Sequence, residues 1–219
     1  MKFIELSSQT AFQDAIKSIG SANRIVVCGS EEDKQYIEDG MKDSTQSVDE
    51  IISASKQIDI HAWFSKRKDK LDQDVEKDLT ELLGEWPAEP EAQQGFSLTF
   101  DMLSGKPHKD LVGAAIETDV SWKIPAHFKF GGWDETPAPA LHCAIWKYWQ
   151  HKYGAEIVGV SNDVIEAYIT NPPKTNEEAI QLAWEQYLYC NDIVDHGVET
   201  ISKLGASIIN HSSWYFWWD

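Results

Sequence analysis

The sequence predicts an α/β or α+β protein with a mixed β-sheet and helices packed on it. Short runs rich in β-branched residues are typical of strands, and several longer segments place apolar residues at helical spacing behind capping residues. The chain also ends in SSWYFWWD (212–219), whose five consecutive aromatic residues favour a strand. With 219 residues, 42% of them hydrophobic, the chain is long enough to bury a core.

The N-terminal segments alternate between strand and helix patterns. KFIEL (2–6) and RIVVCGS (24–30) read as strands on either side of a helix from about Ser8 to Ile19, which is a βαβ-like start. EEDKQYIEDGMKD (31–43) reads as a second, exposed helix. These patterns predict that the chain opens with a sheet already covered by helices.

A capping box and a long apolar stripe follow. Ser47 and Glu50 can satisfy each other's free backbone N–H groups at the start of a third helix. From Ile60 to Leu83, apolar residues recur at helical spacing on a charged background, which predicts one long helix with a single buried face.

The segment GEWPAEPEAQQG (84–95) predicts a boundary, because it is poor in apolar residues and carries four glycine and proline residues. We therefore expect an acidic, helix-rich region over residues 1–90 and a tryptophan-rich domain over residues 95–219. Segments 96–103 and 111–119 read as strands, and 120–130 is expected to be extended because Pro125 lacks an amide donor.

The C-terminal half has clear start and stop signals. A helix is expected from Pro139 to Tyr153, ended by Gly154, and segments 155–160 and 164–169 read as paired strands joined by a turn. Thr175 and Glu178 form a second capping box, for a helix that runs to Gly197. A last helix, from about 198 to 209, leads into the aromatic tail.

Strand geometry sends alternate residues of the tail to opposite faces. One face is expected to lie in the core, and the other is covered either by a helix or by a ligand. One face would carry Trp214, Phe216 and Trp218, and the other Tyr215, Trp217 and Asp219.

The net charge of −17 bears on partners and on location. Residues 31–91 contain 18 acidic and 8 basic residues, a net of −10, so phosphates are repelled and a basic protein partner is favoured over nucleic acid.

The three cysteines are too far apart for a CxxC motif, which argues against disulfides or structural zinc. With neither a signal peptide nor a membrane span visible, we expect a cytoplasmic protein.

The common nucleotide, acyl-transfer and metal motifs are missing from the sequence, which argues against an enzyme without excluding one. The best catalytic candidates are Asp192, Asp195 and His196, which would share one helix face and could orient a general base. The alternative is a purely structural role, in which the helix dipole favours His196 and Asp192 is its ion-pair partner. The sequence predicts no bound metal and no cofactor.

Two segments are candidates for binding a partner. The loop FGGWDETPAP (130–139) presents Trp133, Asp134 and Glu135, although Trp133 could instead plug the core. The second candidate is the acidic part of the long predicted helix, whose exposed carboxylates would attract a basic partner. These carboxylates are Asp72, Asp74, Glu76 and Asp78.

Several of these segments together resemble a known family. They are GGWDETPAP, WQHKYGAEIVGVSNDVIE, NPP, EEAIQLAWEQYLYCNDIVDHG and the closing WYFWWD. In their order they are similar to a bacterial family described as domain of unknown function 4253, chiefly over residues 120–219. This resemblance implies a domain type and carries no activity or site residue with it.

Two functions of different classes are consistent with the sequence. The first is a cytosolic protein-binding module, in particular an acidic immunity protein that neutralises a toxin. The alternative is a hydrolase-like or metal-assisted enzyme that uses a carboxylate and histidine group of Asp192, Asp195, His196 and Asp219. A concave site at that group would favour the enzyme, and a continuous acidic face would favour the binding module.

Overall fold

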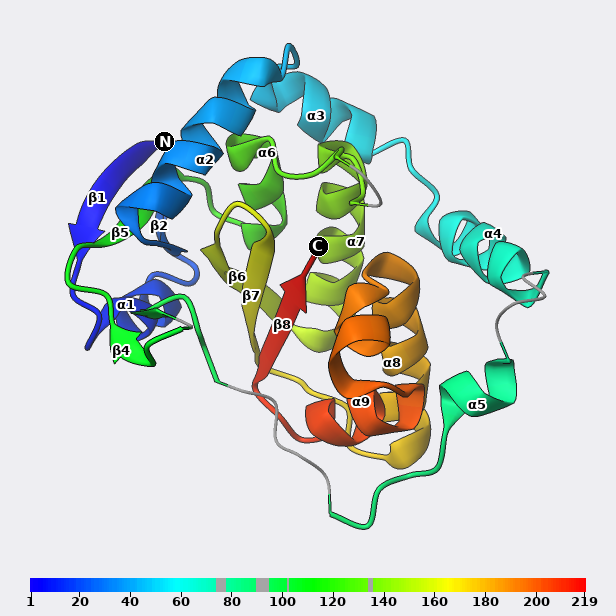
Figure 1. Ribbon diagram of the computed structural model, residues 1–219. Helices are drawn as coiled ribbons and strands as arrows, with labels where there is room; N and C mark the ends of the chain where they lie inside the picture. The colour runs from blue at the N-terminus through cyan, green and yellow to red at the C-terminus, as the bar shows by residue number, and fades with distance from the viewer. Residues whose placement is uncertain (74–77, 90–94, 102, 134–135) are drawn as a thin grey trace.

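The computed structural model describes residues 1–73, 78–89, 95–101, 103–133 and 136–219. Within these residues, six strands form one mixed sheet in the order β1-β5-β2-β6-β7-β8 (Figure 1). The bounds of these strands are β1 Lys2–Leu6, β5 Leu111–Glu117, β2 Asn23–Gly29, β6 Ala155–Val160, β7 Val164–Ile169 and β8 Ser213–Trp217. A mixed sheet with helices packed on it confirms the predicted fold class.

The start of the chain is a split version of the predicted βαβ unit. Helix α1 (Ala11–Lys17) connects β1 to β2, but β5 lies between these two strands and pairs antiparallel with both. Strand β2 also pairs in parallel with β6, at Val27 and Gly159. Strands β6, β7 and β8 then continue as antiparallel neighbours. The sheet therefore takes strands from both of the regions that the sequence separates at residues 90–95.

The predicted capping boxes are confirmed. The Ser47 hydroxyl accepts from the Glu50 amide at 3.3 Å while the Glu50 carboxylate accepts from the Ser47 amide at 2.7 Å, and α3 (Val48–Ser55) follows. Thr175 starts α8 (Asn176–Tyr189) in the same way. Helix α7 (Pro139–Tyr153) has the predicted bounds, and Gly154 ends it in the left-handed conformation, with φ 60°.

The aromatic tail is a core strand, as predicted. Strand β8 pairs with β7, and Trp214, Phe216 and Trp218 are buried. The Phe216 ring stacks on Trp149 of α7, with 5.5 Å between ring centroids. The last strand is thus fixed both by backbone pairing on one edge and by ring packing against the longest helix behind the sheet.

One segment expected to be extended is helical, and one predicted strand is much shorter than expected. Residues 121–128 are helical, as a short 3₁₀ turn η1 (Ser121–Lys123) and α6 (Ile124–Phe128), because Pro125 lies in the first helical turn, where its missing N–H costs nothing. The buried side chains of α6 pack against α7. Among its described residues, segment 96–103 forms the two-residue strand β3 (Phe100–Asp101), which pairs with β4 (Lys106–Pro107).

Three predicted helices are shorter than expected. The long helix is two helices, α4 (Ile60–Asp72) and α5 (Leu79–Leu83), because Asp78 has extended backbone and caps α5. Helix α8 ends at Tyr189, where Cys190 is extended, and a π-helical segment, η2 (Ile193–Val198), follows. Helix α9 (Ile201–Ile208) completes this layer, and α4 lies outside α7 and α8 in Figure 1.

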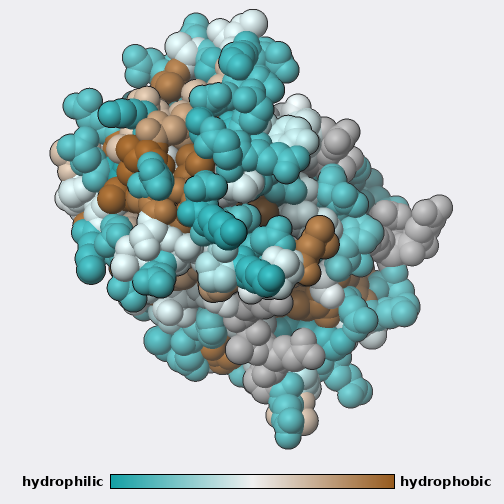
Figure 2. All heavy atoms as spheres, turned by 60° about the vertical axis from the view of Figure 1, so that its left-hand side comes forward, coloured by the Kyte–Doolittle hydropathy of each residue, from teal (hydrophilic) through white to brown (hydrophobic). Residues whose placement is uncertain are grey.

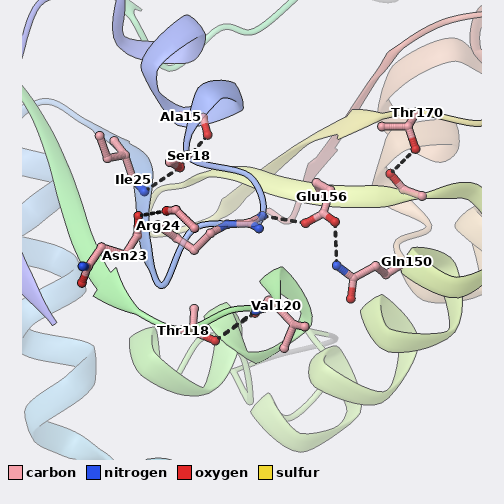
Figure 3. Close-up of polar contacts among 12 residues, drawn as sticks. Ala15, Ser18, Asn23, Arg24, Ile25, Thr118, Val120, Gln150, Glu156 and Thr170 are labelled. Atoms are coloured by element: carbon pink, nitrogen blue, oxygen red, sulfur yellow. Dashed lines mark hydrogen bonds and ion pairs between the residues drawn. The ribbon is translucent and has the colours of Figure 1, made fainter.

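A buried ion pair joins the amino-terminal ends of β2 and β6. Arg24, which is 2% exposed, contacts the Glu156 carboxylate at 2.6 Å, and Gln150 of α7 donates to the other oxygen of Glu156 at 2.7 Å (Figure 3). The backbone ladder registers β2 and β6 at one residue pair, Val27 and Gly159. The ion pair therefore ties together two strands that share little backbone pairing.

Candidate functional site

A hollow lies at the opposite, carboxyl-terminal ends of β2 and β6. It has a volume of about 540 Å³. Here β2 leads into α2 (Glu31–Asp43), and β6 leads into the turn at 161–163. The carboxyl ends of parallel strands are where α/β sheets commonly bind ligands. We call this feature the acidic hollow, because four carboxylate residues line it: Glu32, Asp33, Asp101 and Asp163.

The floor of the acidic hollow is built by Asp33. One of its carboxylate oxygens accepts from the Ser30 amide at 2.7 Å and caps α2, and the other accepts from the Ser161 hydroxyl at 3.1 Å. Asp33 thereby joins the exits of β2 and β6. Burial raises the pKa of the neighbouring Asp163 above its usual range, and the Asp33 charge adds to that rise. Four carboxylate residues line the hollow, so a cation is favoured there over an anion.

A short arm, defined as the described residues 96–101 and 103–108, forms the outer wall. Its hairpin β3–β4 carries Phe100 and Leu103, which are 43% and 99% exposed, and Tyr36 on α2 is 57% exposed on the facing wall. Large apolar groups are thus exposed around a charged cavity. Figure 2 shows this side of the molecule, where hydrophobic groups lie among hydrophilic side chains.

Trp133 lines a second, smaller hollow of about 140 Å³. Its indole packs edge-on against Phe130, with 5.1 Å between centroids, so this residue both contacts the core and faces the hollow. Asp134 and Glu135, the other loop candidates, lie outside the described residues. The small hollow shares Tyr36, Ser161 and Asn162 with the acidic hollow. The two hollows are therefore neighbours beside α2, and we call them together the groove, with the acidic hollow as one part and the smaller hollow as the other.

The outer face of the aromatic tail lines the acidic hollow. Tyr215 and Trp217 are half-buried there, beside Val164 of β7. Of the two coverings that the sequence left open, neither acts alone: Tyr215 and Trp217 line the open hollow and also pack against a small core that includes Ala11 and Ala15 of α1. The tail therefore contributes to the core with one face and to the candidate site with the other.

The catalytic candidates lie elsewhere, at the π-helical turn. Asp192 Oδ1 is 4.0 Å from His196 Nε2, and Asp192 Oδ2 accepts from the Asp219 amide at 3.1 Å. Asp195 lies beside the Tyr187 hydroxyl, at 3.3 Å. The structure thus places the three candidates in one turn, and His196 is exposed. They do not line the acidic hollow or the smaller hollow, and their catalytic role stays a prediction.

The acidic-helix candidates are separated from one another. Asp72 is exposed at the end of α4 and Asp78 caps α5, while Asp74 and Glu76 lie outside the described residues. Helix α4 itself carries four basic and two acidic residues, whereas α2 carries six acidic and two basic residues. The acidic helix of the described structure is therefore α2, which borders the groove.

Comparison with known proteins identifies part of the chain. Residues 114–219 match the family model described as Domain of unknown function (DUF4253). This DUF4253 segment includes most of β5, all of β6, β7 and β8, and the helices between them. It therefore supplies one side of the groove, and the residues before it supply α2 and the arm. The match confirms the resemblance, and neither a curated protein nor a solved structure matches the chain.

Two kinds of feature are missing from the described residues, a metal-binding cluster and a membrane-spanning helix. These residues contain no group of three or more histidine, cysteine, aspartate or glutamate side chains placed to hold a metal ion. In the same part of the chain, no helix is both long enough and apolar enough to cross a membrane.

Sequence reasoning missed most of the groove. Two signals for it were present in the sequence: Ser30 directly follows one buried strand, and the turn Ser161–Asp163 directly follows a second buried strand. Nothing in the sequence shows that these two strands are parallel neighbours, because β5, which is distant in the chain, separates β1 from β2 and leaves the other edge of β2 for β6.

Proposed function

We propose that this protein is a protein-binding module whose partner is basic and binds in the groove along α2. The observation that carries the proposal is the acidic hollow at the carboxyl ends of β2 and β6, bordered by exposed Tyr36, Phe100 and Leu103. The specific form that we propose is a cytoplasmic immunity protein that neutralises a toxin. This form rests on the high negative charge and on a groove that offers charge and apolar contact together.

Charge complementarity supports a basic occupant. A lysine or arginine side chain in the acidic hollow would meet carboxylates from α2, from the arm and from the turn before β7. The net charge of −17 would also attract a basic partner at long range and speed its association. The same field disfavours nucleic acid, since phosphates would be repelled.

The apolar rim supports a protein occupant over a free small cation. Aromatic and large apolar side chains dominate the energetics of protein interfaces, especially beside charges that become desolvated. Tyr36 and Trp133 both line the smaller hollow and could pack against apolar side chains of the same partner. A small inorganic cation would make no use of these surfaces.

Differential capture tests this proposal. The double variant Glu32→Lys/Tyr36→Ala changes two exposed residues of the groove, and Asp72→Lys is a matched charge reversal outside it. Proteins captured from the native host by the wild type and by Asp72→Lys, but lost by the groove variant, are the expected partners. Their association rate should fall as salt rises to physiological levels, where the Debye length is about 8 Å.

The opposite pattern would place the interface elsewhere. Loss of capture with Asp72→Lys and retention with the groove variant would assign the partner to the acidic-helix candidates. Equal capture by all three proteins, independent of salt, would reject an electrostatic interface. A toxin gene beside the gene for this protein, together with loss of protection by the groove variant in cells, would support the immunity role.

A further inference from the structure

Glu166 is a buried carboxyl group below the arm. It lies on β7 and is 1% exposed. Its Oε1 atom accepts from the Ser97 amide at 2.5 Å and from the Ser97 hydroxyl at 2.7 Å, and its Oε2 atom accepts from the Leu98 amide at 3.5 Å. One side chain of the sheet therefore receives three donors from the first residues of the arm.

The sheet has a space shaped for this contact. Gly159 of β6 stands beside Glu166 in the register, and a Cβ atom at Gly159 would lie 2.9 Å from Leu98 Cδ1 and 3.1 Å from Glu166 Oε2. Any larger residue at 159 would displace either the carboxyl group or the leucine. Leu98 itself is buried in the small core on this face of the sheet.

The contact is placed where it can set the shape of the groove. Ser97 and Leu98 line the acidic hollow, as do Phe100, Asp101 and Leu103 further along the arm. The arm is closed on itself by the Phe100 amide, which donates to the Ser97 carbonyl at 2.9 Å, and by the His108 amide, which donates to Thr99 at 2.9 Å. These two bonds connect the Ser97 end of the arm to its hairpin, so a change in the attachment at Ser97 should reach Phe100 and His108.

We propose that Glu166 is the positioning residue of the acidic hollow: its carboxyl group holds the arm against the sheet and so sets the position of the outer wall. The importance of this wall for partner binding rests on the proposed function, but the attachment itself does not. The positioning role can be measured on the protein alone.

Ionisation of Glu166 should change the hold of the arm in a defined direction. Burial raises the pKa of Glu166 to about 7, against the opposing effect of its three hydrogen bonds. If the carboxyl group regains its ordinary pKa near 4.5 when the arm opens, the closed form binds the proton more tightly. The closed arm is then most stable below pH 4.5 and loses stability as pH rises through 7.

Other titratable groups near Glu166 must be separated from this effect. Tyr215 faces it from β8, while Gly159 on β6 contributes no side chain. Asp163 lies near Tyr215, and Asp33, Asp101 and His108 lie further out on the walls of the hollow. Burial raises the pKa of Tyr215 as well, so this residue stays neutral over the range of interest.

Amide hydrogen exchange of the full chain tests the proposal without any partner. After correction for intrinsic exchange rates, protection of the Ser97 amide in the wild type should fall by about 10-fold or more between pH 5 and pH 8. Glu166→Gln, which keeps size and an acceptor oxygen, should hold this protection constant over the same range. Asp163→Asn should keep the wild-type pH dependence.

Ser97→Ala provides a milder variant if Glu166→Gln lowers overall stability. It removes the hydroxyl donor alone and should lower protection at Leu98 and along the arm, while the amides of β7 stay protected. Wild-type protection of Ser97 that is independent of pH, or a pH dependence that persists in Glu166→Gln, would overturn the proposal. A groove variant that fails to lose a partner would reject the proposed function and leave this result unchanged.

Discussion

At the scale of single residues, the buried Arg24–Glu156 ion pair connects strands β2 and β6. Replacing Glu156 with Gln leaves the buried guanidinium of Arg24 without a counter-charge. We expect the free energy of unfolding to fall by about 3–5 kcal/mol, because an uncompensated buried charge is costly. Chemical denaturation of the purified variant measures the loss.

An exposed pair serves as the control for this prediction. Lys42 and Asp39 of α2 contact each other at 2.9 Å, and both side chains are exposed. Since solvent screens such pairs, Lys42→Ala should leave the melting temperature unchanged. Equal effects of Glu156→Gln and Lys42→Ala would show that the buried pair contributes no more than a surface pair.

His142 predicts a specific sensitivity to acid. The Tyr189 hydroxyl oxygen accepts from the Trp146 indole N–H at 2.9 Å and lies 2.6 Å from His142 Nδ1. The hydroxyl can therefore donate its own proton to His142 Nδ1. Burial lowers the pKa of His142 to about 3, and a hydrogen bond with the Pro137 backbone partly offsets this. The folded protein therefore keeps His142 neutral at physiological pH.

The expected pH dependence follows from this lowered pKa. In the unfolded chain His142 takes up a proton near pH 6.5, so its contribution to stability is complete above that pH and is lost as pH falls toward 3. The slope is at most about 1.4 kcal/mol per pH unit. In His142→Phe, unfolding measured between pH 6.5 and 4 should show a shallower slope than in the wild type. Parallel slopes would contradict a buried neutral imidazole.

At the scale of elements, β8 contributes two buried rings, Trp214 and Phe216, to the core. Phe216 is fully buried between β7 and α7, whereas Trp217 on the same strand is half-buried and lines the acidic hollow. Phe216→Ala should cost about 3–5 kcal/mol. Trp217→Ala should cost clearly less, because it leaves the core intact.

Deleting residues 214–219 is the stronger form of this test. The loss of three buried rings is comparable to a total stability of about 5–15 kcal/mol, so the truncated chain should be insoluble or molten. Thermal denaturation followed by near-ultraviolet circular dichroism measures the outcome. Cooperative unfolding of the truncated chain near the wild-type melting temperature would show that the tail is dispensable.

Local sequence signals predicted elements best where backbone chemistry fixes a boundary. Ser47, Thr175 and Gly154 act within one helical turn, so their effects could be read directly. Segment 120–130 was misread, because a proline suits both an extended segment and a first helical turn, and packing against α7 decides between them.

At the scale of the whole molecule, the sheet joins the two regions that the sequence separates. Strand β5 lies between β1 and β2, and β6 lies between β2 and β7. Residues 95–219 expressed alone would leave β5 without either partner. We expect this fragment to lack cooperative unfolding, and adding residues 1–90 in trans should restore it. A fragment that melts cooperatively by itself would establish residues 95–219 as an independent domain.

The sequence by itself determined the fold class, the capped helices, the buried aromatic strand and the resemblance of the C-terminal half to DUF4253. These properties depend on residue spacing and local hydrogen bonds, which the order of amino acids specifies. Only the tertiary structure decided where a site lies. The groove forms because β5 inserts between β1 and β2, sets β2 beside β6, and so brings Asp33 to Ser161 across 128 residues of chain. Pairing between distant strands depends on the combined burial of many side chains, and no short motif encodes it.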